Sequence, residues 1–207
     1  MSARWQSARF RCGFNNRLEI SDGQSLLCHP LVYGAAQTAQ VRDPEQAAEF
    51  RQFISHCNPG MFLFDVGASF GIFSLACARP GGKAIAIDRS PIATNMIAKQ
   101  LKLNNLNDSV RILETAIGDT DGTIKMLSAG IYSDGYYRYR DKRELTRVRV
   151  TTIDHLVERF GRPSHLKIDV EDMKRLSFAV PENCCRGRPH LSSLSSTTKW
   201  TSPQVVM

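Results

Sequence analysis

The sequence lacks the cysteine and histidine patterns that mark disulfide-rich or metal-binding domains. Its six cysteines include no Cys-x-x-Cys pair and show no regular spacing, so we expect reduced thiols and a cytoplasmic protein. His155 and His165 have no partner at metal-ligand spacing, and we expect no metal site. Residues 1–17 are basic, but no apolar stretch follows them, so no secretory signal is predicted.

The sequence also lacks an uninterrupted membrane span. One mostly apolar run, residues 61–78 (MFLFDVGASFGIFSLACA), approaches the roughly 20 residues that a spanning helix needs. It is interrupted by Asp65, Gly67 and Gly71, and an aspartate at the centre of a span costs about 2.5 to 3.5 kcal/mol. We therefore predict no membrane partner. The run instead indicates a buried strand, a glycine loop and a helix.

Acidic residues are scarce in two segments of this basic chain. With 207 residues, 42% of them hydrophobic, the chain is long enough for one domain. Its net charge of +7 is concentrated in residues 138–150, with six Lys or Arg against two Asp or Glu, and in residues 172–207. The Arg and Tyr residues of 136–150 could bind nucleic acid. The alternation of Arg and Val at 147–150 favours a half-buried strand instead, and we expect no nucleic-acid partner.

Strand and helix patterns alternate along the chain. Short apolar runs predict buried strands, and segments that begin with a capping residue or Pro and end with Gly or Asn predict helices. The expected strands lie within residues 61–64, 83–88, 110–113, 118–127 and 165–170, and the expected helices within 43–54, 72–78, 90–105 and 151–161. This order predicts an α/β fold with a Rossmann-like parallel sheet and helices on both faces.

Carboxylates end three of the predicted strands: Asp65, Asp88, and the pair Asp169 and Glu171. Ligands of parallel α/β sheets bind beyond the carboxyl ends of the strands. Because a carboxylate is costly to bury, a polar ligand at this edge is the simplest explanation for these residues.

The glycine spacing separates two classes of ligand. A dinucleotide site needs Gly-x-Gly-x-x-Gly, whereas this loop has three residues between Gly67 and Gly71. Asp65 would repel a diphosphate and attract a cationic amino group and sulfonium, which favours S-adenosylmethionine. Asp88 suits ribose hydroxyls in either class, so a nucleotide-dependent oxidoreductase stays open as an alternative.

Five segments resemble successive motifs of the FkbM-type methyltransferases, a branch of the class I S-adenosylmethionine-dependent enzymes. They are FDVGASFGIFSLACA, AIAIDRSP, ETAIGDTDGTIKML, VTTIDHLVERFG and HLKIDVE, all within about residues 45–171. LKIDVE after the TTID helix is the most family-specific of them. The resemblance implies S-adenosylmethionine as the cofactor and methylation of a hydroxyl group on a sugar or natural-product acceptor.

The resemblance also assigns roles to individual residues. It implies that the loop residues line the methionine and ribose portion of the cofactor, that Asp88 with Arg89 contacts the ribose end, and that Ala116 lies near the adenine. The loop residues are Asp65, Gly67, Ala68, Ser69 and Gly71. Asp169 and Glu171 end a strand beside the reacting centre, where either carboxylate could remove a proton from the acceptor. The family usually has Asn in place of Ser69, whose hydroxyl can still donate a hydrogen bond.

The carboxyl-terminal part departs from this family. After Glu171 the chain lacks the expected glycine and the helix and strands that complete a seven-stranded sheet, and residues 191–202 are rich in Ser and Thr. We therefore expect an amino-terminal extension at 1–44, an incomplete methyltransferase domain at 45–171 and an irregular tail at 172–207. The last strand of the domain would be left with an exposed edge. The chain thus resembles a member of this family that is truncated or frame-shifted after Glu171, and an inactive truncated or vestigial methyltransferase-like protein is the alternative function.

Overall fold

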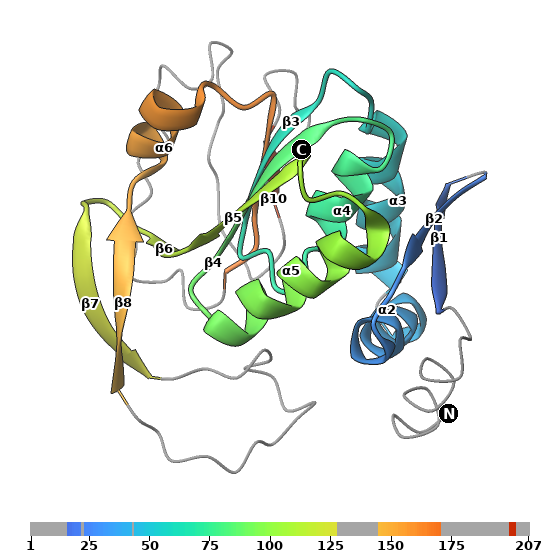
Figure 1. The fold of residues 1–207 in the computed structure, drawn as a ribbon, viewed down its shortest axis with the longest axis horizontal. Helices are drawn as coiled ribbons and strands as arrows, with labels where there is room; N and C mark the ends of the chain where they lie inside the picture. Colours follow the sequence, from blue (N-terminus) through green and yellow to red (C-terminus); the bar gives the residue numbers. More distant parts are fainter. Residues whose placement is uncertain (1–15, 22, 43, 128–144, 171–198, 202–207) are drawn as a thin grey trace.

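The computed structural model describes residues 16–21, 23–42, 44–127, 145–170 and 199–201. Its main sheet has five strands in the order β10-β9-β3-β4-β5 (Figure 1). β10 runs antiparallel to β9, and the other four strands are parallel. The bounds are β3 Phe62–Val66, β4 Lys83–Asp88, β5 Val110–Glu114, β9 His165–Ile168 and β10 Lys199–Thr201.

Helices cover both faces of this sheet. Helices α3 (Pro44–His56), α4 (Ile72–Ala78) and α5 (Pro91–Asn104) share one buried cluster with Leu63 of β3. Helix α6 (Ile153–Phe160) packs on the opposite face, in a second cluster that contains Phe64. Successive side chains of a strand point to opposite faces, which is why neighbouring residues belong to different clusters. The prediction of a Rossmann-like α/β fold with helices on both faces is confirmed.

The ends of these helices follow the local sequence. The Ser90 side chain accepts a hydrogen bond from the Ala93 N–H at the start of α5, and Asn105 ends the helix with a φ of 56°. The Thr152 side chain accepts from the His155 N–H in the same way at the start of α6. A capping oxygen satisfies an N–H group that has no partner within the helix. No helix among the described residues is long and apolar enough to cross a membrane.

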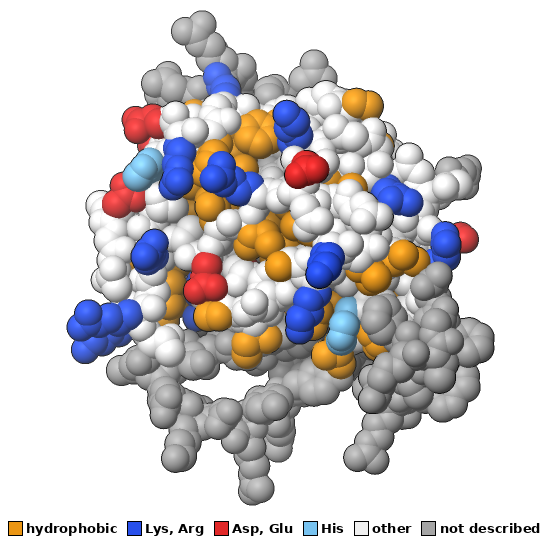
Figure 2. Space-filling model, viewed as in Figure 1, with side chains coloured by type: hydrophobic (Ala, Val, Ile, Leu, Met, Phe, Trp, Pro, Cys, Tyr) orange, Lys and Arg blue, Asp and Glu red, His pale blue; other side chains and the backbone are white. Residues whose placement is uncertain are grey.

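A smaller sheet of three strands, in the order β6-β8-β7, continues from the end of β5. Its strands are β6 Ala116–Ile117, β7 Gly122–Leu127 and β8 Leu145–Thr151. Arg147 and Arg149 are exposed, whereas Val148 between them is buried. The half-buried strand predicted for this segment is therefore confirmed, while residues 136–144 lie outside the described part. On the face drawn in Figure 2, the described Lys and Arg side chains are spread among apolar ones.

The amino-terminal elements pack on the same core as α5. Strands β1 (Arg17–Ser21) and β2 (Gln24–Leu27) form a hairpin, and α2 (Pro30–Arg42) follows them. The Asn104 side chain accepts from the Leu27 N–H at 2.8 Å and donates to the Leu27 carbonyl at 2.9 Å. Side chains of the hairpin and of α2, among them Leu26 and Val32, share a hydrophobic cluster with α3, α4 and α5. The division of the chain between residues 44 and 45 stays a prediction. The hydrophobic core contains residues from both sides of this boundary.

The carboxyl-terminal expectation needs a correction. The edge of β9 is paired, because β10 aligns Lys199 with Ile168 and Thr201 with Leu166 in antiparallel register. A strand within the segment predicted to be an irregular tail thus supplies hydrogen-bonding partners for the edge that was expected to be exposed. Short antiparallel pairing needs no long apolar run, so the sequence carried little signal for it. Residues 171–198 and 202–207 lie outside the described part.

Candidate functional site

The loop between β3 and α4 folds over the end of β4. The N–H groups of Gly67 and Ala68 both donate to the Ile87 carbonyl, at 2.9 and 3.0 Å, and the Gly71 N–H donates to the Ala68 carbonyl at 2.7 Å. Gly67 and Gly71 have φ values of 72° and 74°. Such left-handed conformations favour glycine. The loop therefore makes a tight turn at the carboxyl edge of the sheet, and its role as a binding loop stays a prediction.

Gly67 is also required by a close backbone approach. A Cβ atom at this position would lie 1.9 Å from the carbonyl oxygen of Asp169. No real side chain could be accommodated there unless the end of β9 moved. The missing side chain thus brings two predicted site residues, Gly67 and Asp169, into direct contact.

Ser69 shows what the departure from Asn means physically. Its φ of 51° is left-handed, a conformation that costs a non-glycine residue about 1 to 2 kcal/mol. Asn tolerates this region better because its side chain can hydrogen-bond locally. The Ser69 N–H donates to Asp88 Oδ2 at 2.9 Å, and this bond helps to hold the strained residue in place.

Asp88 is held by backbone groups on both sides. Its Oδ2 accepts the bond from Ser69, and its Oδ1 accepts from the Ser90 N–H at 2.9 Å. The side chain is only half-buried, and a carboxylate oxygen has a second lone pair. Asp88 therefore presents a fixed acceptor at the end of β4, suited to a ligand hydroxyl. Arg89, also half-buried, directly follows it.

Asp65 has a different environment from the one we expected. Its side chain is 0% exposed, and Oδ2 accepts from Ser74 Oγ at 2.7 Å. Oδ1 lies 3.1 Å from the ammonium of Lys167, itself 2% exposed. That oxygen has no hydrogen bond of good geometry within the described residues, so the contact is chiefly one of charge. A cationic ligand is thus not needed to explain the burial of Asp65, and the argument that Asp65 itself selects the ligand does not hold.

Lys167 is the site residue that the sequence reasoning missed. The signal was a lysine inside an otherwise apolar strand, HLKI. Its meaning depends on register, because β3 and β9 run parallel with Asp65 aligned to Lys167. The two residues come from distant parts of the chain, and nothing local indicates which strands are neighbours.

Asp169 extends from the end of β9 toward the edge. Its N–H donates to the Val66 carbonyl at 2.9 Å, its carboxylate lies 3.7 Å from the Lys167 ammonium, and its side chain is 48% exposed. Asp169 is thus both close to the glycine loop and open to solvent. Glu171, the other candidate base, lies outside the described residues.

The remaining predicted contacts differ in accessibility. Ala116 is half-buried in β6, next to Thr115, whose N–H donates to the Asp88 carbonyl at 3.1 Å. Ala68 is 4% exposed, and Gly71 is buried against Ile97. Ala68 and Gly71 therefore determine the shape of the loop, and they leave little surface for contact with a ligand. Gly67, Ser69, Asp88, Ala116 and Asp169 lie along the same carboxyl edge.

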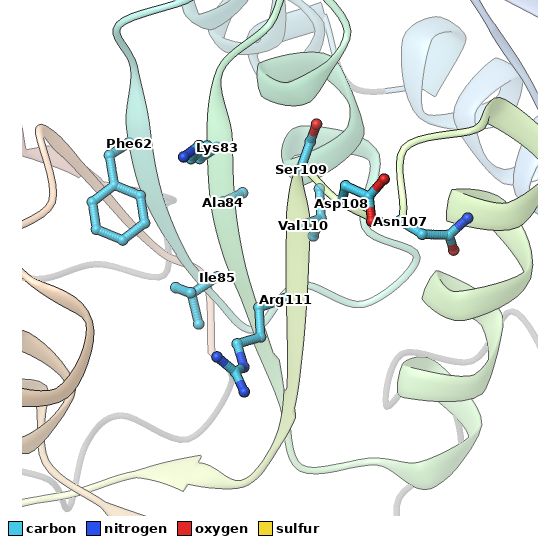
Figure 3. A pocket seen from close by; sticks show the side chains of 9 residues that line it. All are labelled: Phe62, Lys83, Ala84, Ile85, Asn107, Asp108, Ser109, Val110 and Arg111. Atoms are coloured by element: carbon cyan, nitrogen blue, oxygen red, sulfur yellow. The ribbon is translucent and has the colours of Figure 1, made fainter.

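A shallow depression of about 320 Å³ lies elsewhere, at the amino ends of β3, β4 and β5 (Figure 3). Phe62 and Lys83 begin β3 and β4, and Val110 and Arg111 begin β5; all four line it. None of the predicted site residues does. Because ligands of parallel sheets bind at the carboxyl ends of the strands, we do not assign the site to this depression.

The described cysteines and histidines offer no second reactive centre. Burial raises the pKa of the Cys57 thiol to about 12 and that of Cys28 to about 11, and it also raises the pKa of the Cys77 thiol in α4. These thiols are neutral near pH 7 and are poor nucleophiles. His155 lies 3.0 Å from Asp121 on the surface. The described residues contain no cluster of three or more His, Cys, Asp or Glu that could hold a metal ion.

Comparison with known proteins finds several curated methyltransferases and a solved structure that are similar to parts of this chain. Methyltransferase sdnD from Sordaria araneosa is 29% identical over 150 residues, which are 66% of this chain and 56% of sdnD. Ribosomal protein L11 methyltransferase from Desulfitobacterium hafniense is 29% identical over 77 residues, 37% of this chain and 25% of that protein. A crystal structure from Pyrococcus horikoshii, PH0793, named only as a transferase, shares 23% identity over 31% of this chain and 25% of its own, with a TM-score of 0.30.

No family model matches the chain. The chain spans about half the length of sdnD and a quarter of the L11 methyltransferase.

The chain is a Rossmann-like α/β protein. The curated proteins that it resembles over part of their length are named methyltransferases.

Proposed function

We propose that the chain binds S-adenosylmethionine at the carboxyl edge of its sheet and methylates a hydroxyl group on a sugar or natural-product acceptor. The FkbM-type resemblance is the reason for naming this reaction and acceptor. The observation that carries the proposal is Asp88, whose two oxygens are oriented by the N–H groups of Ser69 and Ser90. We further propose a cytoplasmic location, because the cysteine usage indicates a reducing compartment.

The residues present fit this cofactor at its ribose end. Asp88 keeps unused lone pairs beside a loop whose backbone lies close to the end of β4. A fixed carboxylate can accept hydrogen bonds from two neighbouring hydroxyls, and such bonds are stronger than those between neutral groups. Arg89 directly follows Asp88 in the sequence. Ala116 lies beside it along the sheet edge, because the N–H of the preceding Thr115 donates to the Asp88 carbonyl. We assign the ribose to Asp88 and the adenine to the Ala116 side.

The charge argument for a cationic ligand transfers from Asp65 to Asp169. Asp65, Lys167 and Asp169 form a chain of contacts at 3.1 and 3.7 Å with two formal negative charges and one positive. The negative excess is at Asp169, because its side chain is 48% exposed whereas Asp65 is buried. An exposed carboxylate beside Gly67 attracts a cationic amino group or sulfonium at short range.

The bound cofactor would supply a methyl group made electrophilic by the sulfonium. The protein's part is to align an acceptor hydroxyl with that group, since correct alignment alone can supply a large share of a rate enhancement. A hydroxyl loses its proton as it attacks, so a nearby base is needed. We assign this role to Asp169, and Glu171 is the alternative outside the described residues.

Calorimetry on the full chain tests the cofactor assignment. We expect S-adenosylhomocysteine to bind at least tenfold more tightly than NAD, because the loop lacks the spacing for a diphosphate. Methyl transfer from S-adenosylmethionine to a panel of sugars and hydroxylated natural products then tests the acceptor. Tighter binding of NAD, or no binding of S-adenosylhomocysteine, would contradict the proposal.

A nucleotide-dependent oxidoreductase is the second candidate, and one observation favours it. Because Lys167 offsets the charge of Asp65, that carboxylate no longer repels a diphosphate near the loop. The comparison of NAD with S-adenosylhomocysteine decides between the two. The glycine spacing and the methyltransferase relatives still favour the first.

A further inference from the structure

Lys167 has an unusual environment for a lysine. It is 2% exposed, in a strand between Leu166 and Ile168. Its ammonium lies 3.1 Å from Asp65 Oδ1 and donates to the Gly67 carbonyl at 3.3 Å. Further contacts are Asp169 Oδ2 at 3.7 Å and the ring of Phe73, whose centroid is 4.8 Å away. A lysine removed from water is costly to bury, and these four contacts compensate for that cost.

The partners of Lys167 belong to four different segments. Asp65 is in β3, Gly67 begins the loop, Phe73 is in α4 and Asp169 follows β9. Neutralising a buried lysine requires only one carboxylate, which Asp65 provides. The contacts with the Gly67 carbonyl and with Asp169 are additional. They join the first residue of the loop to the carboxylate that we assign to the reacting centre.

We propose that Lys167 is a positioning residue, which holds the Gly67 backbone and the Asp169 carboxylate in one arrangement. Since Gly67 and Asp169 already touch through their backbones, the ammonium closes a second connection between the same two points. Lys167 is too buried to contact a ligand and acts through these two neighbours. The inference rests on the proposed function, which it deepens by naming the group that orders the cofactor loop.

Three variants of the full chain separate this role from simple core stability. Lys167→Met removes the charge and keeps a flexible side chain of similar shape. Because it leaves Asp65 buried without a cation, Asp65→Asn is added in a double variant. Ser74→Ala is the matched control, since it removes the other partner of Asp65 and leaves the contacts of Lys167 with Gly67 and Asp169 in place.

Amide hydrogen exchange measured by NMR is the decisive readout. In the double variant we expect the amides of Gly67, Ala68 and Ser69 to exchange about tenfold faster than in the parent or in Ser74→Ala. We also expect affinity for S-adenosylhomocysteine to fall about tenfold, because the loop is no longer held in place. The melting temperature of the double variant should match that of the control.

The inference is overturned if these loop amides exchange as slowly in the double variant as in Ser74→Ala. If the double variant does not fold, Lys167→Arg decides the question, because it keeps a positive charge beside Asp65 and alters the reach to the Gly67 carbonyl. Faster exchange of the loop amides in that variant supports the inference, and unchanged exchange contradicts it. If the parent binds no S-adenosylhomocysteine, the proposed function fails, while the exchange rates still decide whether Lys167 orders the loop.

Discussion

Asp65 lies one residue before the end of β3 and Asp88 ends the adjacent parallel strand β4, yet their carboxylates have opposite environments. Asp65 is fully buried, with Ser74 and Lys167 as partners. Asp88 is half-buried, and among the described residues its oxygens accept from backbone N–H groups of the loop and of the α5 cap. The first carboxylate is matched by a charge from the protein, whereas the second keeps capacity for a ligand.

This difference shows that position at a strand end does not by itself make a carboxylate a ligand contact. A buried carboxylate needs a partner, but that partner can be a lysine on the neighbouring strand as well as a bound molecule. The two residues should therefore respond differently to the same substitution. Asp65 should affect folding more than binding, and Asp88 binding more than folding.

The largest effect is expected for Asp65→Ala. Removing one partner of a buried ion pair leaves Lys167 poorly compensated and costs about 3 to 5 kcal/mol. Urea unfolding of the variant and the parent measures the change in the free energy of unfolding. A loss in the free energy of unfolding below about 1 kcal/mol, the range of exposed ion pairs, would show that the pair contributes little to stability. Asp65 would then not differ from Asp88 in its effect on folding.

Gly67→Ala should have the next largest effect. Its left-handed φ costs about 1 to 2 kcal/mol for alanine, and overpacking against the Asp169 carbonyl adds about 1 to 3 kcal/mol. Gly122→Ala is the matched control, because a Cβ there meets nothing within 4 Å. Chemical denaturation of both variants checks this. Equal stability of the two would mean that the loop and the end of β9 are not in close contact.

Asp88→Ala should weaken binding with a smaller change in stability. Loss of a charge-assisted bond to a ligand hydroxyl is expected to cost about 1.5 to 3 kcal/mol of binding free energy. Calorimetry with S-adenosylhomocysteine measures this, and Asp108→Ala, an exposed residue of the opposite depression, is the control. If Asp88→Ala binds as tightly as the parent, the contrast between the two carboxylates has no functional meaning.

The smallest effect is expected for Ser69→Gly. Glycine relieves the left-handed strain at this position but has more freedom in the unfolded chain, so a net gain of about 0.5 to 1 kcal/mol in the free energy of unfolding is predicted. Ser55→Gly in α3 is the control and should lower stability instead, because glycine is a poor helix former. A loss of stability in Ser69→Gly would indicate that the serine side chain supports the loop.

Most helices and strands between residues 44 and 170 were predictable because their signals are local. Ser90, Pro91 and Asn105 mark the ends of α5 within one segment, and the alternation at 147–150 identifies a half-buried strand. The β10 pairing was not predictable, since three residues carry too little pattern to name a partner. The packing of the amino-terminal hairpin on α5 was also not predicted. It depends on a hydrogen bond between the Asn104 side chain and the Leu27 backbone, which are 77 residues apart in the sequence.

The sequence by itself determined most strands and helices between residues 44 and 170, the glycine loop and the carboxylates near the carboxyl edge, because spacing along a short segment decides each of them. Only the tertiary structure decided which of those carboxylates is satisfied by the protein. Asp65 and Lys167 are far apart in the chain and meet only when β3 and β9 pair in parallel register. Electrostatic interaction depends on distance and burial, and neither can be read from the separation of two residues in sequence.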